Sequence, residues 1–306
     1  MHIRLKPILA LVLLLAMSSS LAQTTVSEVS DVADESEMLK IAALEALISA
    51  PPERALPLAT KVLHSNNSDE VKELALFVLS QIDLPEAQAT LLEVARSGDD
   101  ELSGEAVRMI GIGGDPEALA GLADLYSTGG EEVREAVLEA YMIAGDTAAV
   151  YQIAQNAANE DEFEAAVEML GVMGARDELR ALRESSGFSE PLIEAYAISG
   201  DFEALLELAM DSSDPEIQAL AIEALGIVGG ENVNAALSEI YLNTDSQDVR
   251  DAALEGMLIA GDDEGVLELY RASDDISEKR DLLEILSVMG SDLVLDVIDE
   301  ALEGGQ

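Results

Sequence analysis

Gly-Asp pairs recur at the ends of apolar runs in this chain, and their residue types are the first that could do chemistry. EAYMIAGD at 139–146 returns as EAYAISGD at 194–201, and ALEGMLIAGD ends at Asp262. Such a pair can belong to a phosphate-binding loop, to a cation site, or to the boundary between two helices. GIGGD at 111–115 lacks the Lys-Ser/Thr of a P-loop and follows a helical pattern rather than a strand. The pairs are therefore first tested as helix boundaries.

Other residue types that support catalysis or metal binding are scarce. The chain of 306 residues has no Cys, which excludes disulfides, thiolate metal sites and Cys nucleophiles. Beyond the N-terminal His2 it has one His, His64, so a His-based triad or metal site has no second His to use. The loops DSSD at 211–214 and ASDD at 272–275 can hold Ca²⁺ weakly, but they serve more simply as helix N-caps. We expect no metal and no cofactor.

A helical pattern repeats seven times around a set of aligned glycines. The intervals between them are 31, 29, 26, 29, 32 and 29 residues. The residues four, seven and eight positions before each glycine are apolar in every case, as expected of the buried stripe of a helix. The seven glycines are Gly114, Gly145, Gly174, Gly200, Gly229, Gly261 and Gly290.

Each glycine is predicted to end one helix, and the residue after it to begin the next. Glycine adopts the left-handed conformation that closes a last helical turn at the lowest cost. Asp follows the glycine in four cases and can accept hydrogen bonds from free N–H groups of the next helix. That helix is short, as in LLELAM after Asp201, and a polar loop precedes the next long helix. The four residues are Asp115, Asp146, Asp201 and Asp262.

Further helices extend the array at both ends. LKIAALEALISA at 39–50 is expected to be the first long helix and ELALFVLSQID at 73–83 the second, with Asp83 in the place of the glycine. LVLDVIDEAL at 293–302 is expected to be the last short helix. The 26-residue interval that ends at Gly200 predicts a kink or a change of twist there.

Three segments resemble HEAT repeats of the short type associated with bilin lyases: 130–145, 213–230 and 246–261. The pairs Val133-Arg134, Val249-Arg250 and Val71-Lys72 match the Val-basic step of that pattern, whereas Ile217-Gln218 and Phe163-Glu164 depart from it. Tetratricopeptide repeats are the competing resemblance, but their period of about 34 residues is longer and their Trp and Pro landmarks are missing. The HEAT resemblance covers about residues 36–302. It implies an all-α, right-handed α-solenoid of about eight to nine helix-turn-helix repeats, with a concave face that receives a partner.

A column of carboxylates is predicted on the exposed face of the long helices. At 100° per residue, the position six before each glycine lies opposite the buried stripe. Glu occupies six of these seven positions, which indicates either a groove for a basic peptide, a polyamine or divalent cations, or a solvated position where Glu is a good helix former. The seven residues are Arg108, Glu139, Glu168, Glu194, Glu223, Glu255 and Glu284.

Arginines cluster at one place in the chain. Arg176, Arg180 and Arg183 share one helical side, inside the short repeat unit. They can bind an anion or an acidic partner, or pair with Asp177, Glu184 and nearby acidic loops. Both interpretations remain open from the residues alone.

The charge of the chain limits its partners. The formal net charge is −46, from 16 Lys and Arg against 62 Asp and Glu. Nucleic acid and anionic membranes are poor partners for such a surface. Adaptation to high salt and recognition of a cationic partner both explain the charge. The expected function is a non-catalytic scaffold that binds a protein or peptide on its concave acidic face; the alternative is an enzyme, or an accessory domain of one, that uses carboxylates in that groove.

The N-terminus has the form of a secretory signal. Arg4 and Lys6 precede an apolar run, and Ser20-Leu21-Ala22 supplies small residues for cleavage after Ala22. We expect a signal peptide at 1–22, a disordered Ser/Thr and acid-rich leader at 23–35, and the solenoid at 36–306. The mature protein is expected in the periplasm or outside the cell. An uncleaved N-terminal anchor is the alternative, and the sequence does not indicate the oligomeric state.

Overall fold

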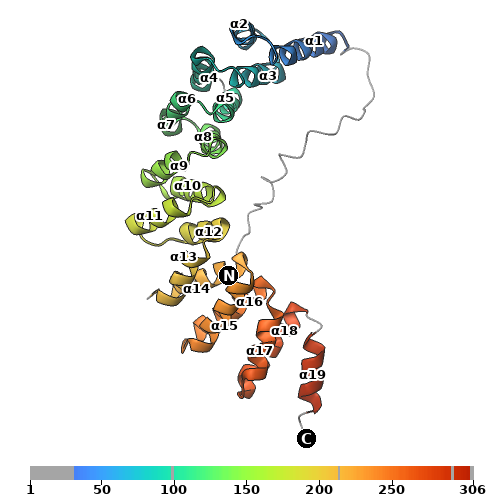
Figure 1. Ribbon diagram of the computed structural model, residues 1–306, viewed down its shortest axis with the longest axis vertical. Coiled ribbons are helices and arrows are strands. Elements are labelled where there is room, and N and C mark those ends of the chain that lie inside the picture. The colour runs from blue at the N-terminus through green and yellow to red at the C-terminus, as the bar shows by residue number, and fades with distance from the viewer. Residues whose placement is uncertain (1–30, 98–99, 213, 291–292, 304–306) are drawn as a thin grey trace.

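The structure is a computed structural model, and it describes residues 31–97, 100–212, 214–290 and 293–303. Within these residues the helices α1 to α19 form nine consecutive pairs, with α6 and α7 together as the second member of the third pair, and the pairs stack into a curved rod (Figure 1). The expected signal peptide and residues 23–30 of the expected leader lie outside the described residues. The architecture is an all-helical α-solenoid, as the repeat pattern predicts.

Two layers of helices build the rod. The first helix of each pair packs against the first helices of neighbouring pairs and lies on the concave side (Figure 1). These inner helices are α1 (Asp31–Leu47), α3 (Asp69–Ser80), α5 (Asp100–Gly113), α8 (Glu131–Ala144), α10 (Glu160–Val172), α12 (Glu190–Ser199), α14 (Pro215–Val228), α16 (Gln247–Ala260) and α18 (Ile276–Met289). The outer helices are α2 (Pro52–Leu63), α4 (Pro85–Ser97), α6 (Pro116–Ala120), α7 (Leu122–Thr128), α9 (Thr147–Gln155), α11 (Arg176–Ser186), α13 (Phe202–Asp211), α15 (Glu231–Asn243), α17 (Asp263–Ala272) and α19 (Leu293–Glu303).

The predicted helix boundaries are confirmed at the glycines. All seven aligned glycines have positive φ angles, between 65° and 71°. Gly229 differs from the left-handed caps in its ψ angle of −179°. Each of the four aspartates that follow a glycine accepts one hydrogen bond from the backbone N–H of the residue three positions later, at 2.8 to 3.3 Å. The Gly-Asp pairs thus end one helix and cap the next, and neither the phosphate nor the cation interpretation is needed.

The core is continuous along the rod and consists of small and aliphatic side chains. The stripe four residues before each glycine is buried, with Tyr196 and Leu225 at 0% exposure. Some inner helices approach one another through glycine: a Cβ on Gly226 of α14 would lie 2.5 Å from the carbonyl oxygen of Gly256 in α16. Each pair contacts only the pairs next to it in the stack, so these close contacts between neighbouring pairs stabilise the rod.

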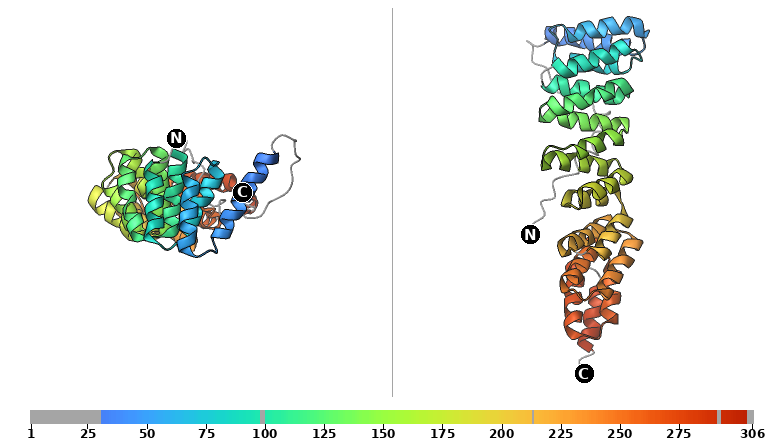
Figure 2. Two further views of the ribbon diagram at one scale, coloured as in Figure 1. Left: turned by 90° about the horizontal axis from the view of Figure 1, so that it is seen from above. Right: turned by 90° about the vertical axis from the view of Figure 1, so that its left-hand side faces the viewer.

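The short interval has a simple structural origin. Helix α12 has 10 residues, where the flanking α10 and α14 have 13 and 14. The helices before α12 lie across the long axis of the rod, whereas those of the last repeats are steeply inclined to it (Figure 2). The predicted change of twist therefore falls close to the shortened helix.

Two expectations from the sequence differ from the structure at its N-terminal half. Helix α1 begins at Asp31, so helix replaces the last five residues of the expected leader; the acids of this segment suit a helix N-terminus. The short helix expected after Asp115 is divided at Gly121 into α6 and α7. None of the described helices is long and apolar enough to span a bilayer.

Candidate functional site: the concave face

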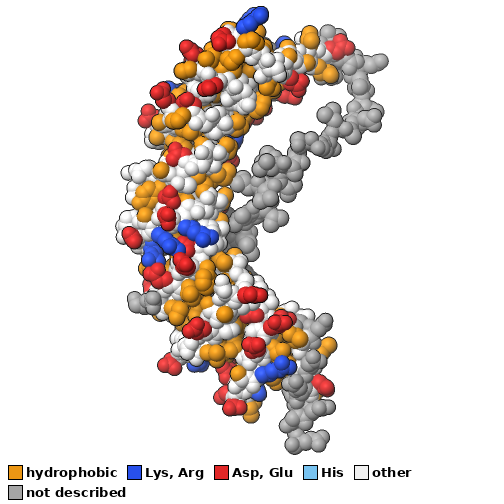
Figure 3. All heavy atoms as spheres, viewed as in Figure 1, with side chains coloured by type: hydrophobic (Ala, Val, Ile, Leu, Met, Phe, Trp, Pro, Cys, Tyr) orange, Lys and Arg blue, Asp and Glu red, His pale blue; other side chains and the backbone are white. Residues whose placement is uncertain are grey.

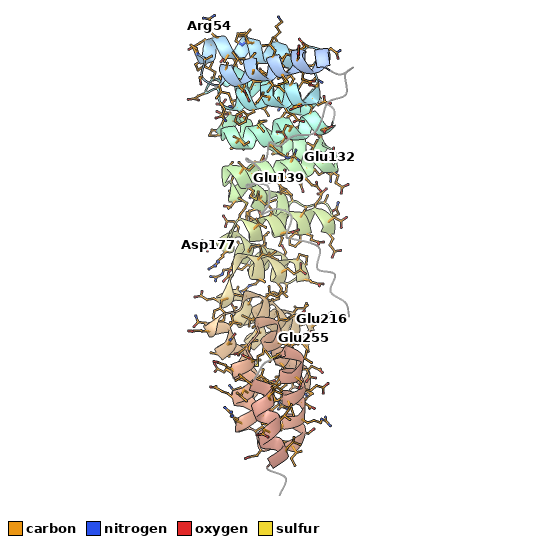
Figure 4. All side chains as sticks on the ribbon, turned by 90° about the vertical axis from the view of Figure 1, so that its right-hand side faces the viewer. Arg54, Glu132, Glu139, Asp177, Glu216 and Glu255 are labelled. Atoms are coloured by element: carbon orange, nitrogen blue, oxygen red, sulfur yellow. The ribbon has the colours of Figure 1, made fainter. Side chains whose placement is uncertain are left out.

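The carboxylate column lies on the concave face. Figure 4 looks onto this face and shows Glu139 of α8 and Glu255 of α16 near the midline of the inner helices, with Glu132 and Glu216 toward the edge where these helices begin. None of the seven residues of the column is buried, so the predicted orientation away from the core is confirmed. Successive inner helices thus bring forward carboxylates that are about 30 residues apart in the sequence.

Arg108, the first residue of the column, shows how a basic group pairs with a carboxylate of the column. Nε of Arg108 in α5 lies 2.6 Å from a carboxylate oxygen of Glu139 in α8, the next position of the column. One of its terminal nitrogens lies 3.5 Å from Glu105. Neighbouring positions are therefore within reach of one guanidinium, and a carboxylate of the column accepts a charge-assisted hydrogen bond.

Carboxylates crowd one another at two places along this face. Partial burial raises the pKa of Glu223 in α14, and the charges of Glu255 and Glu190 raise it further. Burial likewise raises the pKa of Glu73 in α3, with added repulsion from Glu105 and other nearby acids. A cation bound at either place would relieve this repulsion.

An open hollow lies on the inner helices at the N-terminal end of the face. It has a volume of about 390 Å³. Its lining combines apolar side chains with carboxylates, and Phe77 of α3 stands in it at the position six before Asp83. The lining residues are Ile41, Glu45, Glu70, Glu73, Leu74, Phe77, Glu105 and Met109.

The sequence analysis missed an apolar feature of the concave face. The position two before each aligned glycine holds Ile or Val in all seven repeats, and all seven side chains are exposed. They are Ile112, Ile143, Val172, Ile198, Ile227, Ile259 and Val288. The signal lies in the same alignment, because the position two before each glycine is apolar in every repeat although it falls outside the buried stripe.

The arginine cluster is engaged within the chain. Arg180 of α11 makes two hydrogen bonds to Asp201, at 2.6 and 2.8 Å, and Arg183 makes two to Glu207 of α13, at 3.1 and 3.2 Å. Arg176 donates to the carbonyl oxygen of Ser199 at the end of α12. Their partners thus belong to the following repeat, rather than being Asp177 and Glu184. In this arrangement the arginines join α11 to its neighbours across the shortened repeat, and Figure 3 shows Lys and Arg side chains gathered midway along the rod.

A larger cavity lies away from the concave face. It has a volume of about 850 Å³ and lies between α6 and α7 on one side and α9 on the other. Tyr126, Leu119 and Ile153 contribute to its lining, together with Asp146 and Glu162. Both carboxylates have partners within the chain: Asp146 caps α9, and Glu162 accepts from Arg134 at 2.8 Å. The cavity marks the place where the divided outer helix leaves a gap in the outer layer.

Metal-binding clusters are not found in the described part of the chain. No group of three or more Asp, Glu or His side chains there is arranged to hold a metal ion. The concave carboxylates are therefore spread along the rod rather than gathered into a coordination shell.

Stacked helix pairs with an open concave face define the class as a helical-repeat solenoid. Within this class the family is shown, because the HEAT repeats family matches residues 59–142 and 147–258. The chain belongs to the HEAT-repeat family, whose architecture is typical of proteins that bind other proteins.

Similar solved structures are distant. The complex of CpcE and CpcF of phycocyanin lyase from Nostoc sp. PCC7120 matches at 20% identity and a TM-score of 0.33, over 79% of this chain and 95% of that one. Human deoxyhypusine hydroxylase in complex with glycerol matches at 19% identity and a TM-score of 0.33, over 89% of this chain and 94% of that one. No curated protein matches the sequence. These likenesses are too weak to bear on what this chain binds or does.

Proposed function

We propose that this protein is a non-catalytic scaffold that binds a basic segment of a protein partner on its concave face. The observation that carries the proposal is the bridge from Arg108 to Glu139, in which a guanidinium from one position of the column already pairs with the carboxylate at the next position. A partner's Lys or Arg side chains would take the same place at the glutamates farther along. Because none of these carboxylates is fully buried, salt screens the attraction and should weaken the binding.

The open shape of the face favours a scaffold over the alternative, a carboxylate-based enzyme. Acid-base catalysis needs a pocket that holds a substrate and gathers carboxylates of different pKa. The column instead takes one residue from each inner helix and runs along an open surface, as Glu139 of α8 and Glu255 of α16 show (Figure 4). A long, repetitive surface of this kind is suited to a long partner.

Changing three glutamates of the column together tests the proposal. Binding of a lysine-rich peptide is measured at low salt, by fluorescence anisotropy, for the wild type and for the triple variant Glu139→Gln, Glu194→Gln, Glu223→Gln. We expect the triple variant to bind about tenfold or more weakly, since each removed charge contributes roughly 0.5 kcal/mol. The wild-type affinity should also fall as salt rises.

The control removes the same charge from the outer layer. Glu86, Glu117 and Glu239 are exposed residues of α4, α6 and α15. Their triple change to Gln alters the net charge equally and should leave affinity within about twofold of wild type. Equal losses in both triple variants would mean that only net charge attracts the peptide, and an unchanged affinity in the column variant would end the proposal.

We also propose that the protein is exported. The basic start, apolar run and small residues of segment 1–22 support cleavage after Ala22. Expression of the full chain in a bacterial host, followed by intact mass measurement, should give a mature protein that begins at Gln23. A protein that keeps Met1 or the apolar run would contradict the proposal.

A further inference from the structure

The exposed aliphatic residues form a second line beside the carboxylate column. The position two before each glycine is one turn after the column position on the same helix, about 6 Å farther along its axis and only 40° around it. Both positions lie opposite the buried residue four before the glycine, such as Tyr141 or Tyr196. We call the seven Ile and Val side chains the aliphatic track.

Packing within the chain does not account for the track. Its seven side chains are 38% to 65% exposed. Helix propensity does not account for it either, because Ile and Val are weaker helix formers than the polar residues available for a solvated position. Single exposed apolar residues are ordinary, but a regular line of them along one face is typical of a binding surface.

The two lines divide the concave face across its width. Acids such as Glu132 and Glu216 lie where the inner helices begin, the column lies near the midline, and the aliphatic track lies toward the ends of the same helices. A partner that fits must carry a basic edge beside an apolar edge. The basic edge of the partner rests on the proposed function. The apolar edge is an addition that goes beyond the proposed function.

We propose that the partner segment is a basic amphipathic α-helix that lies along the rod, with its apolar edge on the aliphatic track and its basic edge on the column. Stacked helices lie about 10 Å apart. Seven residues of an α-helix span about 10.5 Å, so one heptad of the partner matches one repeat of this chain. Each repeat then contacts one heptad of the partner, which supplies one apolar side chain to the track and one basic side chain to the column.

The hollow at the N-terminal end fits the same partner chemistry. The track does not extend into the second repeat, where Gln81 stands two before Asp83. The hollow lies on the inner helices there and offers Phe77, Leu74 and Met109 within a ring of glutamates. One large apolar side chain flanked by basic residues fills such a space, with the apolar group desolvated and the charges paired at the rim.

The test uses a designed peptide of three heptads with Leu along one edge and Lys along the adjacent edge. A second peptide has the same composition in an order that scatters both residue types around the helix. The protein variant is Ile143→Gln, Ile198→Gln, Ile227→Gln, and Gln preserves helix propensity at these exposed positions. Its control is Leu58→Gln, Met210→Gln, Leu242→Gln, which removes three exposed apolar side chains from the outer helices α2, α13 and α15.

We expect the wild type to bind the patterned peptide at least tenfold more tightly than the scattered one. The track variant should lose at least tenfold affinity for the patterned peptide, whereas the control should stay within twofold. Helix content and thermal unfolding of all variants should match the wild type. Equal binding of the two peptides, or an unchanged affinity of the track variant, would overturn the aliphatic track as a docking surface.

Failure of this inference differs from failure of the proposed function. If the glutamate triple variant loses affinity and the track variant does not, the partner is basic but not amphipathic. If only the track variant loses affinity, the partner binds through apolar side chains, and the proposed binding of basic side chains to the column is wrong. Binding that depends on both lines supports the amphipathic helix.

Discussion

Two tyrosines at equivalent positions join the two layers of the solenoid through their hydroxyl groups. Tyr141 donates to the carbonyl oxygen of Leu119, and Tyr196 donates to that of Leu179, each at 3.2 Å. Burial is the main cause that raises the pKa of each tyrosine to about 12. Both hydroxyls are therefore protonated donors at neutral pH.

Removing one of these donors should destabilise the chain modestly. Tyr196→Phe leaves the Leu179 carbonyl without this partner in the core, and we expect the free energy of unfolding to fall by about 1 kcal/mol. Urea unfolding measures the change. Tyr151→Phe is the matched control, because its hydroxyl is only partly buried and accepts from the exposed Gln155. Equal effects of the two changes would show that the buried hydrogen bond contributes nothing specific.

The pair of Arg180 and Asp201 holds a buried carboxylate. The side chain of Asp201 is 1% exposed, whereas that of Arg180 is 41% exposed. Asp201 also caps α13 through the N–H of Ala204. Loss of the arginine would leave this carboxylate in a nearly dry site without its counter-charge.

Arg180→Gln should therefore lower the free energy of unfolding by about 1–3 kcal/mol, with solvent at the exposed guanidinium moderating the effect. Addition of Asp201→Asn should recover part of the loss, because Asn still caps a helix and carries no charge. Arg280→Gln breaks a pair whose side chains are 74% and 50% exposed to solvent, and should leave stability close to that of the wild type. A double variant as unstable as Arg180→Gln alone would contradict this assignment.

The inner helices show how their packing sets the tolerance for side chains. A Cβ on Gly226 would lie 2.5 Å from the carbonyl oxygen and 2.8 Å from Cα of Gly256, both backbone atoms. A Cβ on Gly104 in α5 would meet only side chains, at 3.7 and 3.8 Å. Both glycines lie in inner helices, but there is no room for a side chain at Gly226 and there is room for a methyl group at Gly104.

Opposite effects are expected from the same substitution at these two places. Gly226→Ala should force α14 and α16 apart and destabilise the chain by about 1–3 kcal/mol. Gly104→Ala should stabilise it by about 0.5–1 kcal/mol, since alanine costs less conformational entropy in a helix. Thermal unfolding of the two variants checks both signs, and a stabilising Gly226→Ala would show that the helices are not in close contact there.

The helix order and the caps follow from local chemistry, which explains why they could be predicted from the sequence. A glycine with positive φ and an aspartate that caps the next helix act within a few residues of the chain, and the buried stripe repeats within one helix. The orientation of the glutamate column follows from the same periodicity. The division of the outer helix at Gly121 was not predictable in this way, because ALAGLADLY is a good helical pattern throughout.

Contacts between repeats were less accessible to sequence reasoning. The partners of Arg176, Arg180 and Arg183 lie 21 to 24 residues ahead, and which residues meet depends on how one pair stacks on the next. Sequence neighbours such as Asp177 and Glu184 were the natural guess. Finding the aliphatic track requires both the sequence and the structure. The repeat pattern identifies its residues, and the stacking of the helices shows that they remain exposed.

For the molecule as a whole, the crowding of acids makes stability depend on pH. The pKa values of Glu73 and Glu223 are raised above the ordinary value of 4.5, by burial first and by neighbouring acids second. At these two groups the folded chain therefore binds protons more readily than the unfolded chain in the pH range just above 4.5. Where the native state binds more protons, stability increases as pH falls.

We accordingly expect the protein to unfold at a higher temperature at pH 5.5 than at pH 7.5, in low salt. The change Glu73→Gln, Glu223→Gln removes both groups, so it should raise stability at pH 7.5 and reduce the difference between the two pH values. Glu93→Gln, at an exposed position of the outer helix α4, should preserve the difference. High salt should also reduce it, because the repulsion among exposed carboxylates is screened. A wild-type protein that is more stable at pH 7.5 than at pH 5.5 would show that the crowding of acids on the concave face does not govern its stability.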